Sequence, residues 1–297
     1  MDNRTLALLA ALIATTIYGL NHTIAKGLMP IYIKPFGLIL LRVLGATILF
    51  WIISIWGPKE RIESKDWKRI FLSALFGMAI NMLMFFKGLS LSTPINSSIL
   101  ITFSPILVFL MSAFFIKEKI TFIKFLGISL GFSGALSLIL FNNEVRQDAP
   151  NITLGNILFV INSISYGIYL IIVKPLTSKY HSLTLMKWLF LIAFFINLPI
   201  TITEFIEVEW SSLPFEAIWK LIFVVVGTTF LTYLLNVFAL RELKASTIGV
   251  FMFLQPLIAI VFAVIVGSDS LNLIKIVSAI LIFTGVYLVS KKSKQLV

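Results

Sequence analysis

The chain has no cysteine, only two histidines and few charged residues among its 297 residues. Without cysteine there are no disulfide bonds, thiolate metal ligands or cysteine nucleophiles. Charged residues make up 12% of the chain, whereas the surface of a soluble domain needs about a quarter. Apolar residues make up 59%, and the mean hydropathy is +1.03. This composition excludes an ordinary soluble protein and predicts that most of the surface faces lipid.

Sequence features of enzymes and of nucleic-acid-binding proteins are missing as well. The sequence has no His-Glu-x-x-His metal pair, no Walker-type phosphate loop and no pair of carboxylates inside an apolar run, and two histidines leave little scope for a Ser-His-Asp triad. The net charge is +11, but Lys and Arg stand singly between apolar runs and form no basic patch. We therefore expect neither an enzyme nor a nucleic-acid-binding protein, and no cofactor or metal is implied.

Ten apolar runs are each long enough to cross a bilayer, since a hydrocarbon core of about 30 Å needs about 20 helical residues. The connections are too short for a soluble domain, so the predicted fold is all-α and integral to the membrane, with ten transmembrane helices. The first run shows no small-residue cleavage site and is expected to be retained rather than removed as a signal peptide. The runs are 5–25, 36–56, 67–86, 94–116, 121–141, 154–173, 185–203, 217–240, 245–266 and 271–290.

Basic residues are distributed unevenly between alternate connections. With the N-terminus inside, the inner segments hold 17 Lys and Arg and the outer segments hold six, while Arg42 lies within a run. Basic loops remain on the cytoplasmic side of the membrane. We therefore expect a multi-pass protein of the plasma (inner) membrane with both termini in the cytoplasm.

The second half of the sequence repeats features of the first. Matched pairs are Tyr18 with Tyr166 and Lys26 with Lys174 at a shift of 148 residues, and Pro105 with Pro256, Glu118 with Asp269 and Gly134 with Gly285 at a shift of 151. The predicted repeats, 1–148 and 149–297, each hold five spans, and an odd number makes the second copy enter the membrane inverted. Inverted repeats are typical of carriers with a midplane site. One repeat is expected to rock against the other around that site.

Several motifs of the first half recur in looser form in the second half. They comprise Tyr18 to Lys26, Pro35, Arg42, Lys87 to Ser92, Pro105, Ile116 to Thr121, Gly127 and Gly134. These motifs resemble those of the EamA-type transporters of the drug/metabolite transporter superfamily. Two departures fall in the second half, where Asp269 stands in place of the usual Glu and Ser278 in place of the usual Gly. The resemblance implies a carrier for amino acids, other metabolites or drugs, and it leaves the cargo open.

Polar side chains within the apolar runs are candidates for a substrate site, because polar groups in hydrocarbon usually face the protein interior or a water-filled cavity. Helical spacing places several of them together on common faces, and we expect these faces to converge on a central cavity. Polar contacts that only join helices are the alternative. The candidate substrate-binding residues are Tyr18, Asn21, His22, Arg42, Asn81, Asn162, Tyr166, Tyr169, Thr232, Tyr233, Asn236 and Gln255.

Two candidates carry or can gain a charge. Arg42 is the only charge well inside a run, and burying it costs about 2.5 to 3.5 kcal/mol. It either holds a substrate carboxylate or phosphate, or reaches headgroups or backbone carbonyls in a structural role, which we favour. His22 is the proton carrier if transport is proton-coupled, or else a hydrogen-bonded packing residue. Glu118 and Asp269 are expected at opposite membrane faces in ion pairs that fix helix ends.

Pro105 and Pro256 occupy matched positions inside the fourth and ninth runs. Proline removes a backbone hydrogen bond and bends a helix. Both residues are therefore candidate hinges.

A carrier is the leading functional hypothesis, namely an exporter of a small polar or amphipathic metabolite that alternates between inward-open and outward-open states. The alternatives are movement of a lipid-linked or nucleotide-sugar substrate, a membrane enzyme, and a non-transporting subunit. The expected partners are a small-molecule substrate and the lipid bilayer. Ten helices can enclose a cavity alone, so a monomer is expected.

Overall fold

Long apolar helices account for nearly all of the secondary structure in the computed structural model, which describes residues 3–107, 109–110, 121–141, 146–243 and 245–290. The predicted ion-pair residue Glu118 lies outside these ranges. The described chain contains no β-strand, and Arg146 and Ala149 form one isolated bridge. The all-α part of the prediction is confirmed.

In the first half of the chain, the first three helical stretches extend beyond the predicted apolar runs at one or both ends. A π-helical segment, Leu75–Ile80, interrupts the third of them between α3 and α4. The helices of this half are α1 (Asn3–Lys26), α2 (Pro35–Ser54), α3 (Trp67–Ala74), α4 (Asn81–Leu91), α5 (Pro94–Ile101) and α7 (Phe122–Phe141), with a short 3-10 turn η1 (Ser64–Asp66) before α3.

The second half repeats this organisation, including a π-helical segment, Phe223–Leu231, between α10 and α11. The shift of 151 residues found in the sequence places Leu75–Ile80 on the second part of this segment, residues 226–231. The helices are α8 (Ile152–Thr177), α9 (Ser182–Ile206), α10 (Phe215–Ile222), α11 (Thr232–Glu242), α12 (Ala245–Ile265) and α13 (Leu273–Ser290), with a 3-10 turn η3 (Trp210–Ser212) before α10.

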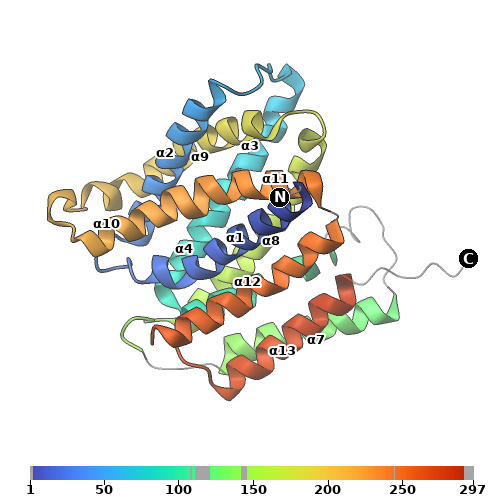
Figure 1. Cartoon of the computed structure of the whole chain (residues 1–297). Coiled ribbons are helices and arrows are strands. Elements are labelled where there is room, and N and C mark those ends of the chain that lie inside the picture. The colour runs from blue at the N-terminus through green and yellow to red at the C-terminus, as the bar shows by residue number, and fades with distance from the viewer. Residues whose placement is uncertain (1–2, 108, 111–120, 142–145, 244, 291–297) are drawn as a thin grey trace, which may run out of the picture.

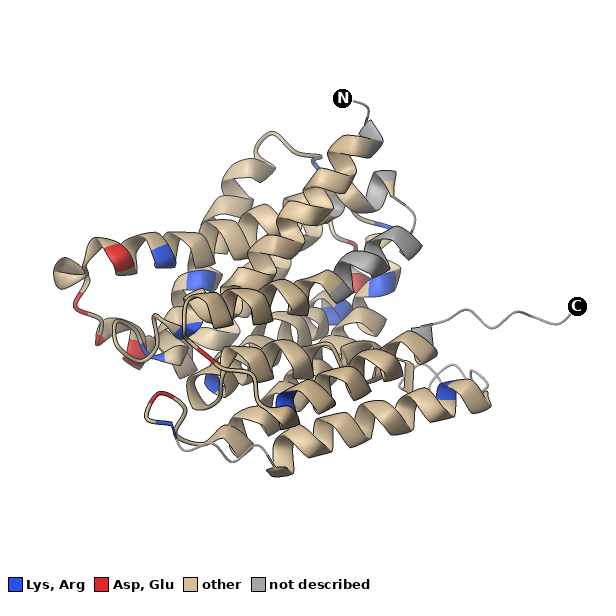
Figure 2. Ribbon diagram, turned by 60° about the horizontal axis from the view of Figure 1, so that its bottom comes forward, with Lys and Arg blue, Asp and Glu red and all other residues tan. Residues whose placement is uncertain are grey.

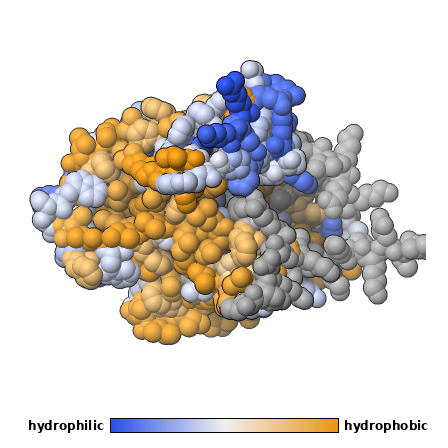
Figure 3. Space-filling view, turned by 45° about the horizontal axis from the view of Figure 1, so that its top comes forward, coloured by the Kyte–Doolittle hydropathy of each residue, from blue (hydrophilic) through white to orange (hydrophobic). Residues whose placement is uncertain are grey.

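The protein is a multi-pass membrane protein. Seven described helices are long and apolar enough to cross a bilayer, and three shorter apolar stretches, Pro94–Leu107, Leu254–Ile265 and Leu273–Val289, fall within the remaining predicted runs. The count of ten spans therefore stays a prediction. Most of the ribbon carries no charge (Figure 2). A hydrophilic cap at the top of Figure 3 stands above a largely apolar surface, which is the pattern expected of a surface in contact with lipid.

Helices of the first half pack mainly against helices of the second half. The closest pairs are α7 with α13, α2 with α9, α1 with α12 and with α11, and α4 with α8, and α7 and α13 lie side by side in Figure 1. These contacts join the two halves, so a motion of one half against the other must rearrange them. The expectation that one half rocks against the other stays a prediction.

Glycine allows α7 and α13 to approach closely. A Cβ atom built on Gly127 would lie 2.8 Å from the carbonyl oxygen of Gly285, and one built on Gly134 would lie 2.9 Å from that of Ser278. The backbones are therefore nearly in contact, as is common where small residues line a membrane helix interface. Gly134 and Gly285, which match in the sequence repeat, therefore lie on the two helices of this pair.

The two candidate hinge prolines have different surroundings. The helix that begins at Pro94 is broken at Thr102 and Phe103, two residues before Pro105. Proline at 105 cannot donate to the carbonyl of Ile101, and the Ser104 hydroxyl donates to that carbonyl instead, at 2.6 Å. In the second half, α12 continues through Pro256 without a break.

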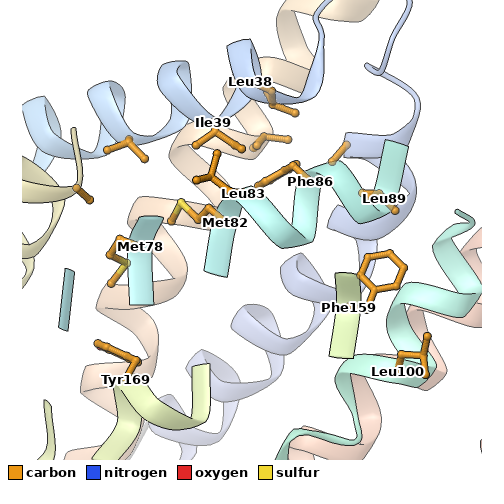
Figure 4. Packing of buried hydrophobic residues seen from close by; sticks show 14 of the residues in the cluster. Leu38, Ile39, Met78, Met82, Leu83, Phe86, Leu89, Leu100, Phe159 and Tyr169 are labelled. Atoms are coloured by element: carbon orange, nitrogen blue, oxygen red, sulfur yellow. The ribbon is translucent and has the colours of Figure 1, made fainter. Parts of the chain in front are cut away.

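The buried core lies around the segment that runs from the first π-helical stretch into α4. Figure 4 shows Met78, Met82 and Leu83 on this segment, with Ile39 of α2 on one side and Tyr169 of α8 on another. All five belong to one continuous cluster of buried apolar residues. This core joins α2, α4 and α8 and so fixes the walls of the candidate site.

Candidate functional site

Four tyrosines and one arginine gather between α1, α2, α8 and α11. Tyr233 of α11 lies near Tyr18, Tyr169, Tyr166 and Arg42. The rings of Tyr166 and Tyr169 lie 5.9 Å apart between centroids, at 35°. All five residues were predicted to contribute to a site, and we call this group the tyrosine–arginine cluster.

Tyr166 is the partly open member of the cluster. It is 39% exposed and lies near Tyr18 of α1 and Tyr233 of α11. The ring of Tyr169 packs on Gly77, where a Cβ atom would lie 2.4 Å from the ring, so glycine in the first π-helical segment leaves space for this tyrosine.

Arg42 is buried in the cluster with most of its hydrogen-bonding capacity unused. The residue is 7% exposed. Its Nε donates to the Thr229 hydroxyl, and its guanidinium lies over the Phe86 ring, 5.3 Å from the centroid. Within the described part of the chain, its Nη groups have no hydrogen-bond partner and no carboxylate pairs with it. The described contacts of Arg42 are to side chains, and none is to a backbone carbonyl.

The second π-helical segment positions the partners of Arg42 and Asn21. The hydroxyls of Thr228 and Thr229 donate to backbone carbonyls five residues earlier, Phe223 and Val224, as the wider π-helical turn allows. Thr229 then accepts from Arg42, while Thr228 also donates to Asn21 Oδ1 at 3.1 Å. Thr232 lies beside the Tyr18 hydroxyl and donates to the Thr228 carbonyl. Thr228, Thr229 and Thr232 therefore hydrogen-bond within their own helix or to α1 and α2, and Tyr233 of the predicted polar face of this helix belongs to the cluster.

A cavity of about 190 Å³ lies next to the cluster, at the connection between α8 and α9. Tyr233 belongs to both, because it lines the cavity and lies near Arg42. The rings of Phe50 and Phe190 lie 6.3 Å and 5.7 Å from its ring, both edge to face. The cavity is lined by Phe50, His181, Ser182, Leu183, Met186, Tyr233, Leu234 and Phe238.

An ionic network lies at the opposite end of α8. Asp269 is buried, and its carboxylate accepts from Lys275 Nζ at 2.9 Å, from Arg146 Nη1 at 3.0 Å and from the backbone N–H of Ile95 at 3.1 Å. This network fixes the start of α5 and the start of α13 to the connection between α7 and α8. The prediction that Asp269 forms an ion pair at a helix end is confirmed.

Two further charged residues extend this network. Lys26, at the end of α1, donates to the backbone carbonyls of Leu89, Ser90 and Asp148. Burial disfavours ionisation of Asp148, but the hydrogen bonds and charge of Arg146 outweigh burial and hold the pKa of this carboxyl below its ordinary value. Since α8 is about 39 Å long at 1.5 Å per residue, the network and the cavity lie at opposite ends of the helix bundle.

His22 does not join the tyrosine–arginine cluster. Its Nδ1 lies 2.6 Å from the Ser97 hydroxyl of α5, and its ring meets Phe85 edge to face at 5.7 Å. Asn21, one residue earlier, faces Thr228 on the opposite side. The face of α1 that was predicted to be continuous is therefore divided between two neighbours, and the contacts of His22 are those of a packing residue.

Asn81 and Asn162 bind each other across α4 and α8. The side-chain amide of Asn81 donates to the carbonyl of Asn162 at 3.2 Å, and that of Asn162 donates to the carbonyl of Asn81 at 2.8 Å. Such reciprocal bonds are the polar contacts between helices that the sequence left open as an alternative. Asn236 and Gln255 are partly exposed, and neither makes a hydrogen bond to the described residues.

Replacing Asn162 by leucine is expected to lower the free energy of unfolding by about 1 kcal/mol, because one interhelical hydrogen bond is lost. The apparent affinity for cargo is expected to stay unchanged. Thermal unfolding in detergent and concentration-dependent transport measure the two effects, and Asn81→Leu is expected to behave in the same way. A lowered affinity at unchanged thermal stability would assign Asn162 to the substrate site instead.

Sequence reasoning missed a second polar group between α4, α5, α7 and α8. Asn156 Oδ1 accepts from the Ser92 hydroxyl at 2.7 Å and from Asn96 Nδ2 at 3.2 Å, and Asn156 Nδ2 donates to the Leu138 carbonyl at 3.0 Å. All three polar residues are buried. Asparagine within an apolar run is a signal that identifies such a group, but it does not distinguish helix packing from substrate binding. Nothing in the sequence indicates that the ring of Phe86 would lie against the guanidinium of Arg42.

The sequence profile of the EamA-like transporter family matches this chain twice, over residues 5–140 and 153–291. An "uncharacterized transporter" of Archaeoglobus fulgidus is 27% identical over 282 residues, which cover 94% of this chain and 97% of that protein. The "uncharacterized transporter YetK" of Bacillus subtilis is 21% identical over 235 residues, covering 79% of this chain and 71% of that protein.

Similarity extends to a plant protein and to a solved structure. A WAT1-related protein of Arabidopsis thaliana is 24% identical over 264 residues, covering 82% of this chain and 76% of that protein. One protein crystal structure superposes with a TM-score of 0.60 at 16% identity and covers 97% of each chain. At this identity the likeness concerns the fold.

Proposed function

This chain belongs to the EamA-like transporter family, and from that premise we propose that it is a secondary transporter that exports small amphipathic metabolites through the tyrosine–arginine cluster. The observation that carries the proposal is the position of the cluster. It borders a cavity at one end of the bundle, and an ionic network lies at the other end. A site that communicates with one side at a time is the basis of alternating access.

The sidedness of the proposal rests on the distribution of basic residues. The cavity adjoins His181, in a connection predicted to face the cytoplasm, and the Asp269 network adjoins connections predicted to face outward. The structure then corresponds to an inward-facing state in the plasma membrane. Lys26 and Lys275 lie at the Asp269 end, so the start of α1 and the end of α13 lie at the cavity end, which the proposal makes cytoplasmic.

An inverted repeat with boundaries 1–148 and 149–297 is part of the proposal. It is supported by the two profile matches and by π-helical segments at corresponding positions. The packing supports it too. In the repeat α1 corresponds to α8 and α11 corresponds to α4, and the contact between α1 and α11 is matched by a contact between α8 and α4. The cluster lies between these two pairs. During alternating access each pair takes on the surroundings that the other pair had before.

Transport by the pure protein tests the proposal. Proteoliposomes are given a labelled panel of amino acids, amines, carboxylates and neutral solutes, with and without a pH gradient, and are compared with protein-free liposomes. Specific accumulation of one class supports a carrier. A pH effect that is lost in His22→Ala but kept in Ser97→Ala would make His22 a proton carrier, and accumulation of no class would contradict the proposed function.

Replacing Pro105 by alanine is expected to slow transport by about tenfold, which corresponds to about 1.4 kcal/mol on the barrier. The new N–H can pair with the Ile101 carbonyl, so the helix is expected to close its break at Thr102 and lose a flexible point. Pro256→Ala is expected to have a smaller effect, because α12 is already continuous. Initial rates in proteoliposomes measure both, and equal rates for wild type and Pro105→Ala would exclude a hinge at this proline.

A further inference from the structure

The tyrosine–arginine cluster has an excess of one positive charge. Arg42 lies near Tyr18 and Tyr233, and no carboxylate pairs with it in the part of the chain that the structure describes. A buried arginine is costly in an apolar environment unless an anion or hydrogen-bond acceptors compensate it. The Thr229 hydroxyl and the Phe86 ring supply part of this compensation. The cluster therefore favours a ligand that brings one negative charge.

The geometry of Arg42 specifies the kind of anion. Its Nε is used by Thr229, and the two Nη groups remain for a ligand within the described residues. Two parallel N–H donors match the two oxygens of a carboxylate. A second negative charge on the ligand would find no second cation in the cluster, and a ligand ammonium would lie beside Arg42 without a carboxylate to receive it.

The rest of the cluster is flat and aromatic. Tyr166 and Tyr169 present tilted rings 5.9 Å apart, and Tyr233 is supported edge to face by Phe50 and Phe190. Aromatic side chains bind planar rings by offset or edge-to-face contact. The phenol hydroxyls of Tyr166 and Tyr169 make no hydrogen bond to the described residues and are free to bind polar substituents.

From these observations we propose that the cargo is an organic monocarboxylate with a ring-bearing body and no ammonium group, held by the Nη groups of Arg42 among the four tyrosines. This inference rests on the proposed transport function and narrows the substrate class within it. It predicts discrimination against amino acids, which carry an ammonium beside the carboxylate.

The test uses four labelled probes with one ring and a short chain: 3-phenylpropionate, its neutral amide, 3-phenylpropylamine and phenylalanine. Counterflow into proteoliposomes preloaded with the unlabelled probe is measured for each, because counterflow does not depend on the direction of net transport. Wild type is expected to accumulate 3-phenylpropionate at least tenfold above the other three. Arg42→Gln is expected to remove this preference, and Arg42→Lys, which keeps the charge but loses the paired donors, is expected to weaken apparent affinity about tenfold.

Arg61→Gln is the matched control, since it removes an arginine charge at an exposed position in the α2–α3 connection, and it is expected to transport like wild type. If wild type prefers phenylalanine or the amine, or if Arg42→Gln keeps the preference for the anion, the substrate class is wrong while transport itself stands. Accumulation of none of the probes by wild type would also overturn the substrate class, whereas the proposed function fails only if no class in the wider panel accumulates. Because the comparison of probes on wild type is decisive alone, a failure of Arg42→Gln to fold leaves the proposal falsifiable.

Discussion

Replacing Gly285 by alanine is expected to lower the free energy of unfolding by about 3 kcal/mol. The new Cβ atom would lie 2.5 Å from the carbonyl oxygen of Gly127 and 2.8 Å from the backbone nitrogen of Gly131. Both are backbone atoms in α7, so no side chain can rotate to relieve the overlap. The two helices must separate, and their close packing along the contact is lost. Thermal unfolding in detergent, followed by size-exclusion chromatography of the remaining monodisperse protein, measures the effect.

Gly227→Ala is the control for this substitution. A Cβ atom at Gly227 would come no closer than 3.6 Å to any neighbour, which is ordinary van der Waals contact. The control is expected to stay near wild-type stability, even though it places the same residue type in another membrane helix. An unchanged melting temperature for Gly285→Ala would show that α7 and α13 do not approach as closely as described.

Replacing Asp269 by asparagine is expected to lower the free energy of unfolding by about 3 to 5 kcal/mol, because removal of one partner leaves buried charges uncompensated. Lys275 is fully buried, and Arg146 is mostly so. Both cations lose the same carboxylate. Asp148→Asn is the matched control, since its side chain is half exposed and its loss is expected to cost no more than about 1 kcal/mol.

The same substitution is expected to open the network end of the bundle to water. The chain has no cysteine, so a single Ser98→Cys substitution gives a unique label site behind the network, at a position that is 2% exposed. A water-soluble maleimide is expected to label this cysteine slowly in the wild-type background and at least tenfold faster with Asp269→Asn. Equal labelling rates in both backgrounds would mean that Asp269 stabilises the fold without closing a pathway.

The positions of the helices follow from the sequence, because length and apolarity decide where a helix can cross a bilayer. Their ends do not. α8 begins two residues before its predicted run and continues four residues beyond it, to Thr177, because a helix can extend past the hydrocarbon into the interface. The π-helical segments were beyond prediction, since the sequence pattern does not distinguish them from α-helix, whereas a disturbance of the helix near Pro105 was expected from the proline itself.

The candidate site was predictable in part. Helical spacing and the repeat match selected four tyrosines, and Arg42 was selected as the only charge well inside a run. The structure brings these residues close together, namely Tyr18, Arg42, Tyr166, Tyr169 and Tyr233. The same reasoning included Asn81 and Asn162, which hydrogen-bond to each other across α4 and α8. A helical face shows which residues share a direction, but it does not show which neighbour they meet. For the same reason the unused donors of Arg42 could be found only from the arrangement of α2 against the second π-helical segment.

The contacts between the two halves also matter during synthesis at the ribosome. The first five predicted spans enter the membrane before any helix of the second half exists, so Arg42 is inserted before Thr229 can accept its hydrogen bond. The small-residue surface of α7 likewise remains without its partner until α13, the last of the described helices, has been made. The early spans must therefore tolerate unmatched polar groups in lipid until translation is almost complete. A truncated chain that stops before α13 is accordingly expected to be a substrate for membrane quality-control proteases.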